Sequence, residues 1–233
     1  MSTNLHNPHG IGLPTPIDVN TRAQFITRTY VHLLGAIVGF TLLEVYLFQS
    51  GLAASIAETL MGTSWLLVLG GFMIVGWLSS RVAATVDSLP AQYAALAAYV
   101  VAEAIIFVPL LYVAQSVAPG VIQSAAAVTL IGFAGLTAVV MITKRDFSFM
   151  RSFLLWGGVV ALVLVVAGSL FGFQLGTYFS VAMIAFAGVA ILYDTSNVLH
   201  HYPENRAVAA ALQLFASVAL MFWYVLRLFL SRD

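Results

Sequence analysis

The sequence contains no cysteine and very little charge. The absence of cysteine from 233 residues excludes disulfide bonds, thiol catalysis and cysteine-ligated metal centres. Charged residues make up only 8% of the chain, against ~25% in a typical soluble domain, whereas hydrophobic residues make up 61%. This composition excludes an ordinary water-soluble domain and indicates an integral membrane protein.

The apolar residues fall into seven runs, each long enough to cross a bilayer as a helix. About 20 helical residues span a hydrocarbon core of about 30 Å. Lipid offers no hydrogen-bond partner to the backbone, so each run must satisfy its own N–H and C=O groups, and none alternates as a barrel strand would. We predict an all-α integral membrane protein with seven transmembrane helices at residues 29–47, 64–80, 91–114, 121–142, 153–170, 178–199 and 207–230.

The N-terminal segment differs from the rest of the chain. Residues 1–24 are polar and rich in proline, glycine and asparagine, and they lack the basic start and apolar centre of a secretory signal. We predict a flexible cytoplasmic tail over residues 1–24 and a single seven-helix transmembrane domain over residues 25–233.

Lysine and arginine are distributed unevenly among the predicted loops. With the N-terminus in the cytoplasm, the inner segments hold seven of these residues and the three outer loops hold none. Arg227 and Arg232 conflict with this pattern, because seven spans place them outside; a re-entrant last helix is the alternative, but its length favours a full span. We predict a multi-pass protein of a bacterial inner (plasma) membrane with a cytoplasmic N-terminus.

Three acidic residues lie within the predicted spans, where a charge costs about 2.5 to 3.5 kcal/mol and marks a functional candidate. They are Glu44, Glu103 and Asp194. Counting depth from the helix ends pairs Asp194 with Arg81 and Glu44 with Arg227. No cation shares the level of Glu103, so we expect this side chain to be protonated, hydrogen-bonded or facing water.

Two polar stripes lie on the last two predicted helices. Asp194 and Asn197 share one face of the sixth helix with small residues, while Gln213 and Ser217 share one face of the seventh. We predict that these stripes face each other inside the bundle. The alternative is that they only pack the helices together.

Enzymatic chemistry finds little support. The Tyr193-Asp194 pair is similar to that of intramembrane aspartyl proteases, but their chemistry needs a second intramembrane aspartate, which the predicted spans lack. His200 and His201, followed by Glu204, do not have the His-Glu-x-x-His order of a helical zinc site, and we interpret them as a solvated loop. We predict that the protein is not an enzyme and has no cofactor.

Four motifs carry a family resemblance. They are Arg28-Thr29-Tyr30, the sequence TKRDFSF at residues 143–149, Ile191-Leu192-Tyr193-Asp194-Thr195, and Ala211-Leu212-Gln213-Leu214-Phe215 continuing to Leu226-Arg227. In this order and with this helix count, the chain resembles the Bax inhibitor-1 family, the transmembrane Bax-inhibitor-motif proteins with bacterial YccA-like members.

The resemblance implies a fold of six helices surrounding a central seventh, here residues 207–230, and a pH-sensitive calcium leak. In the family, two aspartates form the sensor and an arginine latches it. Asp194 matches the first aspartate and Arg81 matches the latch by position, but Ser217 stands at the second aspartate. The chain therefore lacks a two-carboxylate sensor.

Two functions of different classes follow. The first is a pH-influenced, calcium-permeable leak channel or cation transport protein. In it Asp194 is the metal ligand and gate, Glu103 and Glu44 add oxygen ligands, and calcium is the permeant ion. Gln213 and Asn197 are further candidates for the ion pathway. The alternative is a non-transporting regulator that binds other membrane proteins, such as a membrane-anchored quality-control protease. The expected partners include the lipid bilayer and calcium ions but no nucleic acid.

Overall fold

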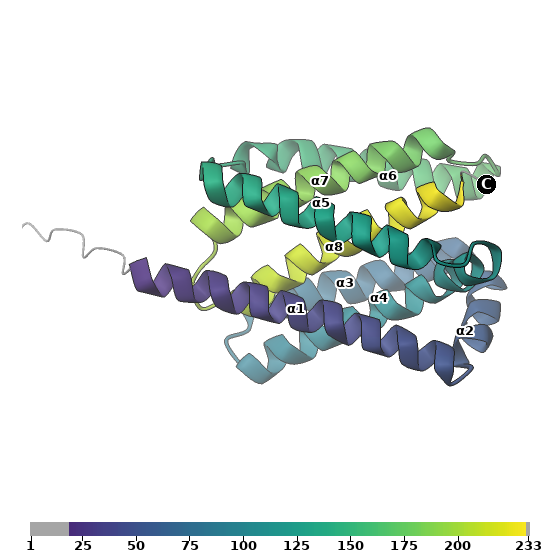
Figure 1. Cartoon of the computed structure of the whole chain (residues 1–233), viewed down its shortest axis with the longest axis horizontal. Coiled ribbons are helices and arrows are strands. Elements are labelled where there is room, and N and C mark those ends of the chain that lie inside the picture. Colours follow the sequence, from purple (N-terminus) through teal and green to yellow (C-terminus); the bar gives the residue numbers. More distant parts are fainter. Residues whose placement is uncertain (1–18, 232–233) are drawn as a thin grey trace, which may run out of the picture.

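A computed structural model describes residues 19–231, which are helical throughout apart from their connections (Figure 1). Seven of the helices are long and apolar enough to cross a membrane, which confirms the all-α, seven-span prediction. The eighth, α2, is shorter. The elements are α1 Val19–Gln49, α2 Leu52–Met61, α3 Trp65–Thr85, α4 Leu89–Val117, α5 Val121–Thr143, the 3-10 turn η1 Ser148–Met150, α6 Arg151–Phe171, α7 Thr177–His200 and α8 Ala207–Leu230.

The N-terminal boundary lies earlier than the sequence suggested. Helix α1 begins at Val19, so residues 19–24, which we placed in the tail, are helical. The Arg22 guanidinium donates to the carbonyl oxygens of Leu199 and Tyr202 at 3.0 and 2.6 Å, which ties this first turn to the end of α7. Residues 1–18 of the predicted tail lie outside the described residues.

Helix α2 was not predicted. Its 10 residues are too few to span a bilayer, so a search for runs of about 20 residues passes over it. Gly51 precedes it with φ 81°, a conformation that glycine adopts without a steric penalty and that lets the chain turn back after α1. Buried Ala53 and Ala57 then pack α2 against the end of the bundle opposite the first turn of α1, where it contacts α1 and α4.

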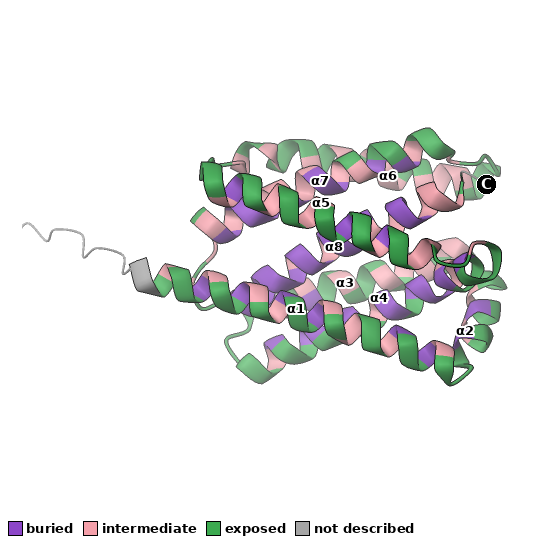
Figure 2. Ribbon diagram, viewed as in Figure 1, coloured by how far each residue is buried: buried purple, intermediate pink, exposed green. Residues whose placement is uncertain are grey.

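Helix α8 is the most extensively buried span (Figure 2). It packs against α1, α3, α4, α5 and α7, and the small side chains of its first turns allow close approach. Helix α6 is different: it contacts α7, α3 and η1 but makes no close approach to α8, and none of its residues is buried. The implied arrangement of six helices surrounding a central seventh is therefore not confirmed, because α6 lies outside α7.

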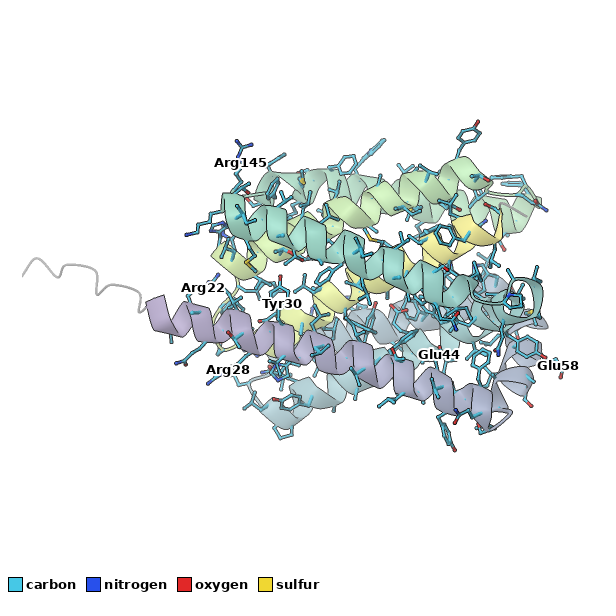
Figure 3. All side chains as sticks on the ribbon, viewed as in Figure 1. Arg22, Arg28, Tyr30, Glu44, Glu58 and Arg145 are labelled. Carbon is cyan, nitrogen blue, oxygen red and sulfur yellow. The ribbon has the colours of Figure 1, made fainter. Side chains whose placement is uncertain are left out.

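The loop between α7 and α8 connects three other segments at one end of the bundle. Besides the contact with Arg22, the Arg206 guanidinium donates to the Val86 carbonyl at 2.6 Å and pairs with Asp87 at 2.5 Å. His201 likewise reaches the loop between α5 and η1. The segments that the charge distribution groups together therefore meet at one end, where Figure 3 also shows Arg22, Arg28 and Arg145.

The last turn of α8 lies at the opposite end of the bundle from the first turn of α1 (Figure 1). There the Arg227 guanidinium donates to the Leu175 carbonyl, in the α6–α7 connection, at 2.8 Å. An odd number of spans requires this separation. Which end faces the cytoplasm stays a prediction.

Candidate functional site

Asp194 and Ser217 form the central polar contact between α7 and α8. Each is only 8% exposed, and the Ser217 hydroxyl donates to Asp194 Oδ2 at 2.6 Å. The predicted facing of the two polar stripes is confirmed at this pair. The contact joins the two helices that share the largest interface of the bundle.

Arg81 does not pair with Asp194, so that prediction is wrong for this structure. The residue is exposed near the end of α3, and its guanidinium lies 5.6 Å from the centroid of the Trp77 ring. Helix α3 packs on α4 and α8 and makes no close approach to α7. Similar depth along two helices brought these residues together in the sequence argument, but the helices that carry them are not neighbours.

Further hydroxyl groups surround the Asp194 end of the bundle. Thr195 is fully buried beside it in the chain, and Tyr30 from α1 lies beside Thr195 and Thr137 of α5. The side-chain oxygens of these three residues are buried, and the Tyr30 hydroxyl interacts with those of Thr195 and Thr137, although none of these contacts has full hydrogen-bond geometry. These hydroxyl groups therefore form a buried polar cluster between α1, α5 and α7.

Asn197 and Gln213, the other candidates for the ion pathway, are half-buried on α7 and α8. The Asn197 carbonyl accepts from the N–H groups of His201 and Tyr202, each at 2.8 Å, and so closes the end of α7. Within residues 19–231, no hydrogen bond joins the side chain of Asn197 or Gln213 to Asp194. The structure therefore brings Ser217, but neither amide, into contact with the carboxyl group.

Tyr202 lies in the connection after α7, half-buried and near Asp194. Burial raises the pKa of the Tyr202 phenol, and the nearby Asp194 carboxyl group raises it further. The phenol is therefore neutral at physiological pH.

Glu103, which has no cation at its depth in the membrane, accepts a hydrogen bond, which is one of the states expected for it. It is 6% exposed, and the Tyr99 hydroxyl, one turn earlier in α4, donates to Glu103 Oε1 at 2.8 Å. The Tyr99 ring in turn packs against Phe72 and Phe215. The expectation that Glu103 is hydrogen-bonded is confirmed, and its partner lies on its own helix.

Glu44 does not pair with Arg227, contrary to the estimate from depth. The Arg227 guanidinium is bound to the Leu175 carbonyl at the end of the bundle. Glu44 is 7% exposed, and neither carboxyl oxygen has a hydrogen-bond partner among the described residues.

The three intramembrane acids do not form a metal centre. Among residues 19–231, no group of three or more histidine, aspartate or glutamate side chains could hold a metal ion. The ligand set expected from Asp194, Glu103 and Glu44 is therefore not assembled. Calcium takes six to eight oxygen ligands, of which protein side chains here would supply a minority.

A second polar cluster, at the α5–η1 loop, escaped the sequence analysis as a unit. Asp146 Oδ2 pairs with His201 Nε2 at 2.9 Å, and Asp146 Oδ1 accepts from the Ser148 N–H at 2.8 Å. The Phe147 N–H donates to Ser196 Oγ on α7 at 2.8 Å. His201 is exposed, as a solvated loop predicts, but it also has a partner. The sequence feature that could have indicated this cluster is the Asp146 carboxylate within the TKRDFSF motif.

These contacts change the acidity of Asp146. The backbone N–H of Ser148 first, and then the His201 imidazole, lower the pKa of Asp146 from an ordinary 3.8 to about 2. Asp146 is therefore ionised throughout the physiological range and bridges the α5–η1 loop to the end of α7.

Comparison with known proteins matches nearly the whole chain to one family. The pattern of the family described as "Inhibitor of apoptosis-promoting Bax1" matches residues 22–233. An uncharacterized protein of Pseudomonas aeruginosa is 35% identical over 112 residues, covering 47% of this chain and 49% of that protein. An uncharacterized membrane protein of Vibrio cholerae is 32% identical over 117 residues, covering 48% and 50%.

The chain spans about half the length of the curated relatives that it matches. The family pattern covers all seven spans, including the Asp194–Ser217 contact and the TKRDFSF loop. The chain is therefore a multi-pass membrane protein that belongs to the Bax inhibitor-1 family.

Proposed function

We propose that this protein is a calcium-permeable leak protein in which the Asp194–Ser217 contact is the closed gate. The observation that carries the proposal is a carboxyl group buried at the interface of two spans and held there by one hydroxyl. A hard cation prefers carboxylate oxygen and would compete with Ser217 for it. We place the gate at the cytoplasmic end of a bacterial inner-membrane protein with an inside N-terminus and no enzymatic activity.

The surroundings of Asp194 favour a passage at this position. The hydroxyl groups of Tyr30, Thr137 and Thr195 lie at the same end of the bundle, and oxygens of this kind can replace part of an ion's hydration shell. Because the gate is a carboxyl group, its protonation changes its affinity for cations, and we expect calcium flux to depend on pH. Because Ser217 stands in place of a second acid, protonation of Asp194 alone neutralises the gate.

The test is calcium flux into liposomes that contain the purified protein and a trapped calcium indicator. Asp194→Asn replaces the charged carboxylate with a neutral amide and should lower the flux by about tenfold, which corresponds to about 1.4 kcal/mol in the barrier. Ser217→Ala removes the contact that holds the gate closed and should raise it. Glu58→Gln, which neutralises an exposed acid on α2, is the control and should change nothing.

Two results would overturn the proposal. One is wild-type flux no greater than in protein-free liposomes, which would favour a regulator that binds other membrane proteins, such as a membrane-anchored protease. The other is wild-type flux that neither Asp194→Asn nor Ser217→Ala alters.

A further inference from the structure

We infer that a cavity lined by α1, α4, α5 and α8 binds amphiphilic amines, with Glu44 receiving the amine nitrogen. The cavity has a volume of about 390 Å³. Neither Asp194 nor Ser217 lines it, so this binding site is separate from the gate and goes beyond the proposed function.

The wall of the cavity suits an apolar ligand with an aromatic or alkyl body. Most of the lining is hydrocarbon, and the rings among it are Phe40, Phe48, Phe107, Phe215 and Phe222. The rings of Phe40 and Phe107 meet edge to face at 5.2 Å, while those of Phe107 and Phe222 stack at 5.5 Å. Because these contacts fix the rings, part of the wall is ordered before a ligand enters.

The polar groups in the cavity point to a hydrogen-bond donor of positive charge. Both Glu44 oxygens and the Thr129 hydroxyl are buried without a partner among the described residues. Leaving a buried carboxyl group unbonded is costly, and Arg227, the nearest cation in depth, is bound to Leu175 instead. An ammonium group brings three N–H donors. An ammonium group with a carboxylate, or a neutral amine with a protonated carboxyl group, gives the same ammonium–carboxylate pair.

The cavity is open to the side of the bundle. Helices α1 and α5 make no close approach to each other, and α8 crosses behind the space between them (Figure 1). Thr41 and Val45 of α1 and Leu130 of α5 line the cavity and are themselves exposed. A molecule dissolved in the bilayer can therefore enter laterally, with its polar end directed to Glu44 on α1 (Figure 3).

Other ligands fit the cavity less well. A calcium ion needs six to eight oxygens, whereas the mostly apolar wall of the cavity offers one carboxyl group and the neutral side chains of Thr41, Gln115, Gln123 and Thr129. A neutral alkyl chain would fill the space and leave both Glu44 oxygens unbonded. An amine on an apolar body satisfies the carboxyl group and the hydrocarbon wall together, and the rings add cation–π attraction.

The experiment measures equilibrium binding of labelled 4-phenylbutylamine to the full-length protein in phosphatidylcholine nanodiscs. The wild-type protein should bind it saturably, and Glu44→Gln should weaken the affinity about ten- to hundredfold through loss of a charge-assisted hydrogen bond. Glu58→Gln, the same chemical change on the exposed face of α2, should leave the affinity unaltered. The neutral analogue 4-phenylbutanol should bind more weakly and should respond little to Glu44→Gln.

A second variant keeps the test decisive if Glu44→Gln does not fold. Ala126→Phe fills the cavity from α5 without touching the carboxyl group and should abolish saturable binding of the amine. Absence of saturable binding by the wild-type protein, or equal affinity in Glu44→Gln, would overturn the inference. If added phosphatidylethanolamine abolishes the binding of 4-phenylbutylamine, the cavity binds the amine headgroup of a lipid, and the inference that its ligand is a free amphiphile is overturned.

Discussion

At the scale of single residues, the buried acids differ in where their partners come from. Glu103 accepts from Tyr99, which lies four residues earlier on the same helix, so the pair is visible in the sequence as a helical i, i+4 spacing. Asp194 accepts from Ser217, 23 residues later on another helix, and only the packing of α7 on α8 makes this contact. Neither carboxyl oxygen of Glu44 has a partner among the described residues.

We predict that the Asp194–Ser217 hydrogen bond contributes to stability as well as to gating. Ser217→Ala leaves a buried carboxyl group unbonded and should lower the free energy of unfolding by about 1 to 2 kcal/mol. Reversible unfolding in detergent mixtures measures this change. Ser55→Ala, at an exposed position on α2, is the control and should be neutral. Equal stabilities of the wild type and Ser217→Ala would show that the bond is replaced by water.

The Asp146 cluster should give a pH-dependent contribution to stability. The pKa of Asp146 is lowered to about 2, so its contribution is complete above the ordinary value of 3.8 and is lost as the pH falls toward 2. The wild type should therefore exceed Asp146→Asn in melting temperature at pH 5 and 6, and the difference should shrink as the pH approaches 2. Thermal melts of both proteins across this range provide the measurement. A difference that does not vary with pH would contradict the role of the ionised carboxylate.

At the scale of elements, α6 shows how little of a span needs to be buried. It has no buried residue, and its packing on α7 depends on the close approach of Gly157 to Phe186. A Cβ atom at Gly157 would lie 2.8 Å from Phe186 Cε2, closer than such atoms approach in proteins. At Gly158 the corresponding distance, to Phe186 Cζ, is 3.8 Å and ordinary.

The two neighbouring glycines of α6 should therefore respond differently to the same substitution. Gly157→Ala forces the Phe186 ring or α6 to move and should destabilise the protein by about 1 to 3 kcal/mol. Gly158→Ala meets no obstacle and should be neutral or stabilising by up to about 1 kcal/mol, because alanine favours a helix. Unfolding of both variants in the same detergent mixture tests this. A similar loss in both would mean that α6 does not tolerate side chains on this face at all.

At the scale of the whole molecule, the loops form two groups at opposite ends. The α7–α8 loop binds the start of α1 through Arg22, the α3–α4 loop through Arg206 and the α5–η1 loop through His201. Arg227 binds the α6–α7 connection at the other end. This grouping agrees with the charge distribution, which assigns the first group to the cytoplasm.

We predict that the loop from Lys144 to Arg151 is cytoplasmic and that the C-terminus is on the opposite side. Reporter fusions after residue 147 and after residue 233 test this, since one reporter that is active only inside and one that is active only outside should give opposite results at the two positions. A cytoplasmic C-terminus would contradict a full crossing by α8. It would leave the inner loops where the charges place them.

The sequence by itself determined that the chain lies in a membrane, the number of its membrane-spanning helices and the way its loops divide between the two ends. These properties depend on composition and on the length of apolar runs, because a bilayer of fixed thickness acts on each segment separately. The TKRDFSF and Tyr-Asp-Thr motifs also identified the family, because both lie in continuous stretches of chain.

Only the tertiary structure decided which polar groups meet. Depth counting placed Arg81 level with Asp194 and Arg227 level with Glu44, yet neither pair forms. A contact requires two helices to be neighbours and to be rotated so that both side chains point into their interface. The position of a residue along its own helix determines neither condition. Packing of α8 between α1 and α7 brings Ser217 to Asp194, and within residues 19–231 it leaves Glu44 without a hydrogen-bond partner.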